Sequence, residues 1–516
     1  MKLSSESAAA LADPPASGLS VGLDRLSSAG LMTLPERAVT RREKASVNKW
    51  LALAIILVGP FLGVIDFFIA NIGVPSIRRA LGASFSEIEL VIAGYGLAYA
   101  VCLITGGRLG DIFGRKITFI AGMGGFTLTS TLCGLAPTTG WLIFGRVIQG
   151  CTAALMFPQA LSFIHVHFSG SAKRLAFSLY GAMIGFGSIV GQLLGGFLIQ
   201  ANLLGLGWRP IFLINLPIGL VTIIAACAVL QESRSDQPPK LDLVGVGILT
   251  LGLGLFSYPF MEAQEFGWTF WAWCSLLASF PVLWVFYLFE RRQSARKQSP
   301  LLEPKLFKDP GFVVGLLVTC IYFAGHTSMI LVLSLYLQFS LTLDPMHAGF
   351  ALVPFSFAFL LGSSVSGKIN GYLGRGSLHL GILVLLIGLL ALGIEAGGAP
   401  AHLTLGFVFT CFLYGIGRGL VTSPLFNTVL SGVPAKEAGA ASGVASTMPQ
   451  LANSVGIALI GAAVFSIIPK HDATPTDYAH GFVVSAAINF GMLLLAAALI
   501  FLIPKTRGRD CAPLNS

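Results

Sequence analysis

Fourteen long apolar runs, separated by short polar segments, dominate the chain. They lie at 50–74, 87–107, 117–135, 141–165, 175–200, 210–230, 241–261, 269–289, 312–339, 347–367, 377–396, 402–429, 440–468 and 480–504. About 20 apolar residues in a helix cross the roughly 30 Å hydrocarbon core, where only helices and closed barrels satisfy every backbone polar group. The runs lack the alternation of barrel strands. The sequence therefore predicts an all-α membrane protein with 14 transmembrane helices.

The composition excludes a soluble globular protein, because only 11% of the residues are charged, against about 25% in soluble domains. Of the 32 Lys and Arg residues, 24 fall on one set of predicted loops and tails. Four fall on the opposite set: Arg78, Arg79, Arg209 and Lys470. This bias predicts a multi-pass membrane protein with both termini in the cytoplasm. The basic loops lie beside anionic lipid headgroups, so the net charge of +9 needs no nucleic-acid partner.

The chain repeats itself at an offset of 260 residues. "GRLGDIFGR" at 107–115 matches "GKINGYLGR" at 367–375, and each follows the second span of a six-span block. Repeated halves are common in transporters. We therefore expect the following segments: a disordered cytoplasmic tail (1–48), a six-helix bundle (49–232), inserted helices 7 and 8 with a basic cytoplasmic loop (233–311), a second six-helix bundle (312–504) and a cytoplasmic tail (505–516).

The segment 107–116 combines glycines with charges between two spans. Gly107 and Gly114 allow close helix approach and a tight turn, while Asp111 and Arg115 can pair or face helix ends at the membrane surface. These properties suit a hinge and latch between helices that move. The segment resembles motif A of the major facilitator superfamily, matching at Gly107, Leu109, Asp111, Gly114, Arg115 and Lys116, with Ile112 in place of the usual basic residue.

Further segments resemble other motifs of the superfamily's fourteen-helix drug/proton antiporter group. "LIFGRVIQGCTAA" resembles motif B, with Arg146, Gln149 and Gly150 matching. "GSIVGQLLGG" resembles the antiporter motif, motif C, at Gly187, Gly191, Gly195 and Gly196. Gln192 stands where that motif commonly has proline, so the helix bend credited to the motif is in doubt. "IDFFIANIGVPSI" resembles the first-span acidic motif and keeps Asp66, with Phe67 at a position usually held by threonine.

The resemblance implies the major facilitator fold, with two six-helix bundles plus an inserted two-helix hairpin. It implies a proton-coupled exporter of amphipathic drugs or toxic metabolites that works by alternating access, with the proton gradient as energy source, no cofactor and a monomeric state. The alternative is a proton-linked transporter, importing or exporting, of an organic anion or other small metabolite. An enzyme is not expected, because the chain lacks HExxH, GxSxG and phosphate-loop motifs and its eight cysteines are scattered singly.

Asp66 is the only carboxylate clearly inside a span of the first half. An ionisable group at membrane depth is costly and indicates function. Such a carboxyl can gain and lose a proton as its surroundings alternate between wet and dry, as proton coupling requires. A static helix-bridging role is the alternative. Arg146 can pair with Asp66 or with a backbone end, and the resemblance assigns it to proton coupling, against a purely structural ion pair.

Arg418 occupies the span equivalent to that of Arg146, where the group usually has an uncharged residue. We expect it either to pair with a carboxylate such as Glu395 or to face an anionic substrate. His326 is near the middle of span 9, as a packed core residue or as a substrate contact or second proton site. The remaining candidates for the substrate cavity are Tyr95, Tyr99, Asn215, Tyr336 and Gln338.

Overall fold

The computed structural model describes residues 48–234, 241–296, 300–301, 304–398, 402–430, 433, 438–469 and 472–502. Within these residues, fourteen helices are long and apolar enough to cross a membrane, which confirms the predicted number of spans. The predicted tails at 1–48 and 505–516 lie outside the described residues, apart from Asn48. The described residues form one compact unit.

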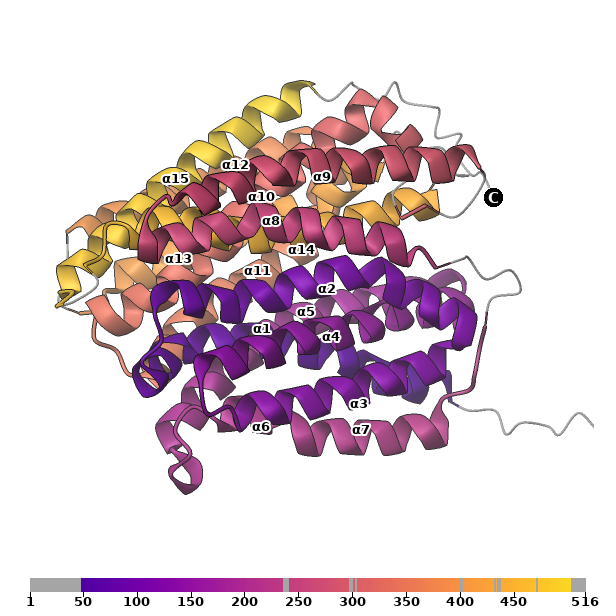
Figure 1. Cartoon of the computed structure of the whole chain (residues 1–516), viewed down its shortest axis with the longest axis horizontal. Coiled ribbons are helices and arrows are strands. Elements are labelled where there is room, and N and C mark those ends of the chain that lie inside the picture. Colours follow the sequence, from indigo (N-terminus) through magenta and orange to yellow (C-terminus); the bar gives the residue numbers. More distant parts are fainter. Residues whose placement is uncertain are drawn as a thin grey trace, which may run out of the picture. The chain divides into compact units, whose positions relative to one another are not determined.

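The helices follow the predicted apolar runs and extend beyond most of them at polar caps (Figure 1). Their bounds are α1 (Lys49–Leu81), α2 (Phe85–Phe113), α3 (Arg115–Gly134), α4 (Thr139–His167), α5 (Gly170–Ala201), α6 (Pro210–Leu213), α7 (Asn215–Val229), α8 (Leu243–Phe266), α9 (Phe270–Ala295), α10 (Pro310–Leu335), α11 (Pro345–Leu373), α12 (Gly376–Gly397), α13 (Leu405–Leu430), α14 (Ala438–Phe465) and α15 (Pro475–Leu502). The short α6 and α7 together form one span, and α10 continues through a π-helical turn, Tyr336–Ser340.

Local sequence explains several helix ends. Ser84 accepts a hydrogen bond from the Glu87 backbone N–H, and Glu87 accepts one from the Ser84 backbone N–H, which forms a capping box before α2. Asp344 caps α11 directly before a proline, a residue suited to the first turn. Gly82 ends α1 with φ +63°, a left-handed conformation that glycine adopts without strain. These caps satisfy terminal backbone groups where the helices leave the apolar region.

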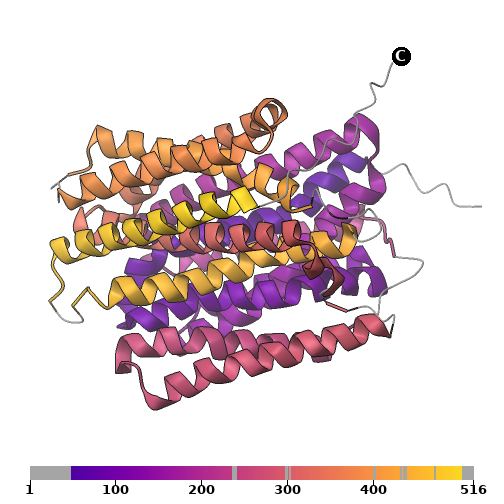
Figure 2. The same ribbon diagram turned by 90° about the horizontal axis from the view of Figure 1, so that it is seen from above.

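The helices of the first half and those of the second half lie on opposite sides of the molecule (Figure 1). The α8–α9 hairpin, rose in Figure 2, lies along one edge, where α8 packs against α2 and α14. Large apolar and aromatic side chains of α9 are exposed, including Phe270, Trp271 and Trp284. This surface fits the lipid environment expected of an inserted hairpin.

Close contacts join the two sets of helices at one end of the molecule, which the distribution of basic residues predicts to be the outer end. α5 packs against α11 there, and an added Cβ at Gly196 would lie 2.4 Å from the Pro345 carbonyl oxygen. Ser334 donates to the Asn71 carbonyl oxygen at 3.0 Å, which ties α10 to α1. Further along α5 toward the opposite end, an added Cβ at Gly185 would lie 2.9 Å from Leu360 of α11, whereas the exposed Gly181 has no described atom within 4 Å of an added Cβ. The described interface is therefore tightly packed at the predicted outer end.

Candidate functional site

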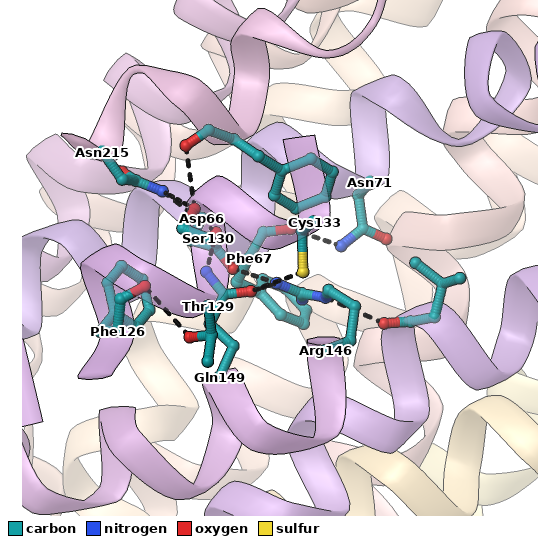
Figure 3. Close-up of polar contacts among 12 residues, drawn as sticks. Asp66, Phe67, Asn71, Phe126, Thr129, Ser130, Cys133, Arg146, Gln149 and Asn215 are labelled. Carbon is teal, nitrogen blue, oxygen red and sulfur yellow. Dashed lines mark hydrogen bonds and ion pairs between the residues drawn. The ribbon is translucent and has the colours of Figure 1, made fainter. Parts of the chain in front are cut away.

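The centre of the site is an ion pair between Asp66 of α1 and Arg146 of α4 (Figure 3). The guanidinium Nη1 of Arg146 donates to Oδ2 of Asp66, and both side chains are fully buried, with 0% exposure. The sequence left open whether Arg146 pairs with Asp66 or with a backbone group. It does both, because its Nε also donates to the Val91 carbonyl oxygen of α2 at 3.0 Å.

Two amides complete the surroundings of the carboxylate. Gln149 donates from Nε2 to Oδ1 of Asp66 at 2.8 Å, and its own Oε1 accepts from Arg146 at 2.8 Å. Asn215, the first residue of α7, donates to the same Oδ1 at 3.3 Å and to the Ser130 hydroxyl of α3 at 2.8 Å. Asp66 therefore accepts three hydrogen bonds, all from side chains of the first six spans (Figure 3).

Aromatic rings cover the cation. The guanidinium carbon of Arg146 lies 4.1 Å from the ring centroid of Tyr95, and Tyr99 stacks behind Tyr95 at 6.4 Å between centroids. Both tyrosines are buried in α2. A desolvated cation over an aromatic face gains about 2 kcal/mol. The predicted cavity residues Tyr95, Tyr99 and Asn215 thus belong to the shell around the ion pair.

This arrangement can bind one proton at the Asp66 carboxylate. A neutral carboxyl group no longer supplies the negative charge that balances Arg146, whose Nη2 has no hydrogen-bond partner. Burial of a cation without a nearby anion is costly. A proton and the guanidinium therefore compete for the same carboxylate, so protonation weakens the link between α1 and α4. In the observed conformation the pair is sealed from solvent.

Motif A forms the turn between α2 and α3. Asp111 and Arg115 pair at 2.9 Å, which is one of the two arrangements that the sequence left open. Gly114 is the single residue between the helices, and its φ of +113° is unfavourable for any other residue. An added Cβ there would also lie 2.3 Å from a carboxylate oxygen of Glu232, so both the backbone and the space require glycine.

Glu232, just after α7, holds this turn in place. Its carboxylate oxygens accept from the backbone N–H groups of Lys116 and Ile117 at 3.1 and 3.2 Å, at the positive N-terminus of α3. The Lys116 ammonium group donates to the Cys227 carbonyl oxygen of α7 at 2.7 Å. Motif A therefore links the α2–α3 turn to the end of the sixth span.

The motif C glycines of α5 face two different helices. An added Cβ would meet Val64 at Gly187, the Ile65 carbonyl oxygen at Gly191 and Ile69 at Gly195, at about 3 Å in each case, and all three neighbours belong to α1. Gly196 instead faces Pro345 of α11. The glycines therefore let α5 approach α1 and α11 closely at the same time.

Gln192, which stands in place of the usual motif C proline, makes a polar contact with the other half. Its Oε1 accepts from the Ser356 hydroxyl of α11 at 3.0 Å, and both side chains are buried. α5 runs as one helix through this position, from Gly170–Ala201. In this chain the position joins α5 to α11 by a hydrogen bond.

His326 and Arg418 come together in a separate cavity inside the second set of helices. Tyr414 contacts the His326 Nδ1 at 3.5 Å. Of the two partners considered for Arg418, Glu395 forms no ion pair with it in the described residues; its carboxylate accepts from the Thr410 hydroxyl at 3.3 Å. No carboxylate in the described residues forms an ion pair with Arg418.

Tyr336 and Gln338 of the π-helical turn lie away from both clusters. Tyr336 is fully buried between Phe407 and Phe482, at centroid distances of 5.6 and 4.8 Å. Gln338 donates to the Ile72 carbonyl oxygen of α1 at 3.0 Å and so helps to close the predicted outer end. In this conformation Tyr336 packs inside the second set of helices and Gln338 joins the two sets.

The structure corrects two sequence-based expectations. Asp66 is not the only carboxylate buried in the first half, because Glu89 of α2 is also fully buried, facing Gly461 of α14. Nothing in the sequence indicated that Glu89 is buried, because glutamates in the first turns of a helix are usually exposed. The cysteines are not all isolated either, because the thiols of Cys102 and Cys151 lie 3.4 Å apart.

Sequence reasoning also missed roles for Gln149 and Glu232 in the site. Gln149 could have been found, because a residue three positions after Arg146 shares its helix face. Glu232 carried no such signal, since it lies in the polar segment after the sixth span and reaches a turn 116 residues earlier in the chain.

Relatives with curated descriptions are bacterial transport and resistance proteins. The chain is 38% identical to the "Probable actinorhodin transporter" of Streptomyces coelicolor, over 83% of this chain and 75% of that protein. It is 32% identical to a puromycin resistance protein of Streptomyces alboniger, over 89% and 92% of the two chains. It is 31% identical to a cephamycin export protein of Amycolatopsis lactamdurans, over 92% and 96%.

Solved transporter structures share the fold at low sequence identity. A bacterial homologue of the lysosomal transporter Spinster superposes with a TM-score of 0.63 at 16% identity, covering 88% of this chain and 96% of that chain. A peptide transporter in complex with sulfate gives a TM-score of 0.62 at 14% identity, over 88% and 94%. The sequence itself matches the Major Facilitator Superfamily over residues 56–457. The chain is therefore a multi-pass membrane transporter of the Major Facilitator Superfamily, and its fourteen helices and export-protein relatives agree with the fourteen-helix drug/proton antiporter group.

Proposed function

We propose that this protein is a proton-coupled antiporter that exports amphipathic drugs or toxic metabolites by alternating access. The observation that carries the proposal is the sealed Asp66–Arg146 pair, which offers one proton site inside a span. The names of its relatives, which include puromycin resistance and cephamycin export, favour export of toxic compounds. We place the protein in the bacterial plasma membrane as a monomer with both termini cytoplasmic.

In this mechanism the helices of 49–232 and 312–504 move as two bundles, with the helices of 233–311 as an inserted hairpin. We assign the observed conformation, with its close packing at the predicted outer end, to a state that faces the cytoplasm. Opening of the other face gives Asp66 access to external protons. Protonation then releases Arg146 from its counter-ion, and the altered packing of α1 against α4 favours return to the observed state.

The motif A and motif C contacts would control this exchange. The Asp111–Arg115 pair and the Glu232 cap fix the α2–α3 turn at the predicted cytoplasmic end. The glycines of α5 and the Gln192–Ser356 hydrogen bond hold α5 against α11 near the other end. Each change between the state that faces the cytoplasm and the state that faces outward must break one of these sets of contacts, because packed interfaces shift between discrete arrangements.

Transport direction can be tested in proteoliposomes without knowledge of how the protein is oriented. With an acidic lumen, an antiporter accumulates puromycin as protons leave, whereas a symporter depletes the lumen of puromycin. We expect accumulation that disappears when nigericin collapses the pH gradient, and no accumulation in protein-free liposomes. Depletion, or uptake that does not respond to the gradient, would contradict the proposal.

The second candidate function is proton-linked transport of an organic anion. It is favoured by one observation, the absence of a carboxylate partner for Arg418 among the described residues. The same assay with an aromatic carboxylate as the substrate in place of puromycin separates the two candidates, because only the second predicts gradient-driven transport of the carboxylate.

A further inference from the structure

The two halves of the chain place similar residues at equivalent positions, with one informative difference. At the offset of 260 residues that relates the two copies of motif A, Asp66 of α1 corresponds to His326 of α10. At the same offset Tyr95, whose ring covers Arg146, corresponds to Phe355, whose centroid lies 5.7 Å from the Arg418 guanidinium carbon. The second half therefore repeats the cation and its aromatic cover but has a histidine in place of the carboxylate.

The position equivalent to that of the amide partner Gln149 is also different in the second half. Gln149 follows Arg146 by three residues and accepts a hydrogen bond from it, whereas the residue three positions after Arg418 is Val421. Arg418 packs over the ring of Phe359 at 4.8 Å, and its Nε is buried without a hydrogen-bond partner. A half-buried cation among apolar helices without an anion among the described residues is costly, so the site is electrostatically incomplete.

Arg418 and His326 line a common cavity of about 10 Å³, which holds roughly one water-sized group. Tyr322, Tyr414 and Asn489 also line it, and among the described residues no Asp or Glu does. His326 is 4% exposed, and its Nε2 has no hydrogen-bond partner. The walls therefore combine a fixed cation with several possible hydrogen-bond donors, and unsatisfied buried donors of this kind call for an acceptor.

We infer that this cavity binds a small anionic group, with Arg418 as the counter-ion and His326 as a hydrogen-bond donor. The group is an inorganic anion such as chloride or the carboxylate of a transported compound, since both bring one negative charge on a compact head. The observed cavity has room for one compact group only, so binding of an organic carboxylate requires the surrounding helices to separate. The second of these sources rests on the proposed transport function. The anion occupies the role in the second half that the Asp66 carboxylate has in the first.

The first test measures binding of 2-naphthoate and its neutral isostere 2-naphthamide to the full chain in nanodiscs, with protein-free nanodiscs as the blank. We expect the carboxylate to bind at least roughly tenfold more tightly than the amide, as one charge-assisted hydrogen bond provides. A chloride titration against gluconate identifies the source: displacement of naphthoate means that inorganic anions bind too, and lack of displacement means that the organic carboxylate is required. Equal binding of naphthoate and naphthamide would overturn the inference.

Three variants separate a binding role from a structural one. His326→Asp restores the carboxylate of the first half and should abolish the preference for naphthoate while raising the melting temperature. Arg418→Met should also abolish the preference, whereas Arg418→Lys keeps the charge and should retain it. Preference for naphthoate in both His326→Asp and Arg418→Met would refute the site, even if either variant were less stable.

The same protein preparations distinguish failure of this inference from failure of the proposed function. Gradient-driven puromycin accumulation is measured in proteoliposomes, independently of naphthoate binding. A preference for naphthoate without puromycin accumulation supports the anion site and argues against the proposed drug antiport. Accumulation of puromycin without any preference for naphthoate rejects the anion site alone.

Discussion

Asp66→Asn tests the central ion pair most directly. The wild-type carboxylate accepts from Arg146 at Oδ2 and from Gln149 and Asn215 at Oδ1. Asparagine keeps one side-chain oxygen, which can still accept from Arg146, and replaces the oxygen that faces Gln149 and Asn215 with an amide donor. Gln149 cannot compensate by turning its amide, because its Oε1 already accepts from Arg146. The substitution therefore removes the buried negative charge and places an amide N–H group against the donors of Gln149 and Asn215.

The expected magnitude follows from the burial of the pair. Removal of one partner from a buried ion pair costs about 3–5 kcal/mol, because the other charge stays buried without compensation. Arg146 retains the Val91 carbonyl oxygen and Gln149 as acceptors, so we expect a loss near 3 kcal/mol in the free energy of unfolding. The double variant Asp66→Asn/Arg146→Met removes both charges and should recover most of this loss, since apolar replacements of buried pairs are often neutral.

Two measurements check this prediction. Unfolding titrations in SDS give the free energies for the double-mutant cycle. Puromycin uptake into acidic-lumen proteoliposomes gives the coupling to protons, and we expect Asp66→Asn to lose gradient-driven accumulation while the protein remains inserted. Asp472→Asn is the control, because Asp472 is exposed and its φ of +57° is one that asparagine tolerates. A loss of stability below about 1 kcal/mol, or normal accumulation by Asp66→Asn, would refute the reasoning.

Three further substitutions test the packing that surrounds the site. Gly196→Ala places a Cβ 2.4 Å from the backbone oxygen of Pro345, so it should cost about 1–3 kcal/mol of stability and lower the melting temperature. Gly181→Ala, at an exposed position of the same helix, should leave the melting temperature unchanged. Glu232→Ala removes the cap of α3 and should cost about 1 kcal/mol in SDS unfolding and slow puromycin uptake; an unchanged uptake rate would count against a role in the turn. Gln192→Pro restores the usual motif C residue but breaks a continuous helix, so we expect a loss of about 3 kcal/mol or more, and a variant as stable as the wild type would show that α5 tolerates the bend.

The path of the chain through the membrane could be predicted from sequence because each span is selected largely by its own hydropathy. The structure keeps all fourteen runs as helices and extends most of them by capped turns. The pairing of Asp111 with Arg115 was accessible as one of two alternatives, since opposite charges four residues apart lie close together even across the tight turn at Gly114. Asp66 and Arg146 were identified as individual residues, because ionisable groups inside apolar runs are rare.

The sequence by itself determined the number of spans, the family and the charged residues at membrane depth, because these depend on local composition and spacing. Only the tertiary structure decided which groups meet. Gln149 and Asn215 reach the same carboxylate from different helices, Gln192 bonds to Ser356 164 residues away, and Arg418 is left without Glu395. These outcomes depend on how each helix is rotated about its axis, which is set by close packing at glycines between helices distant in the chain.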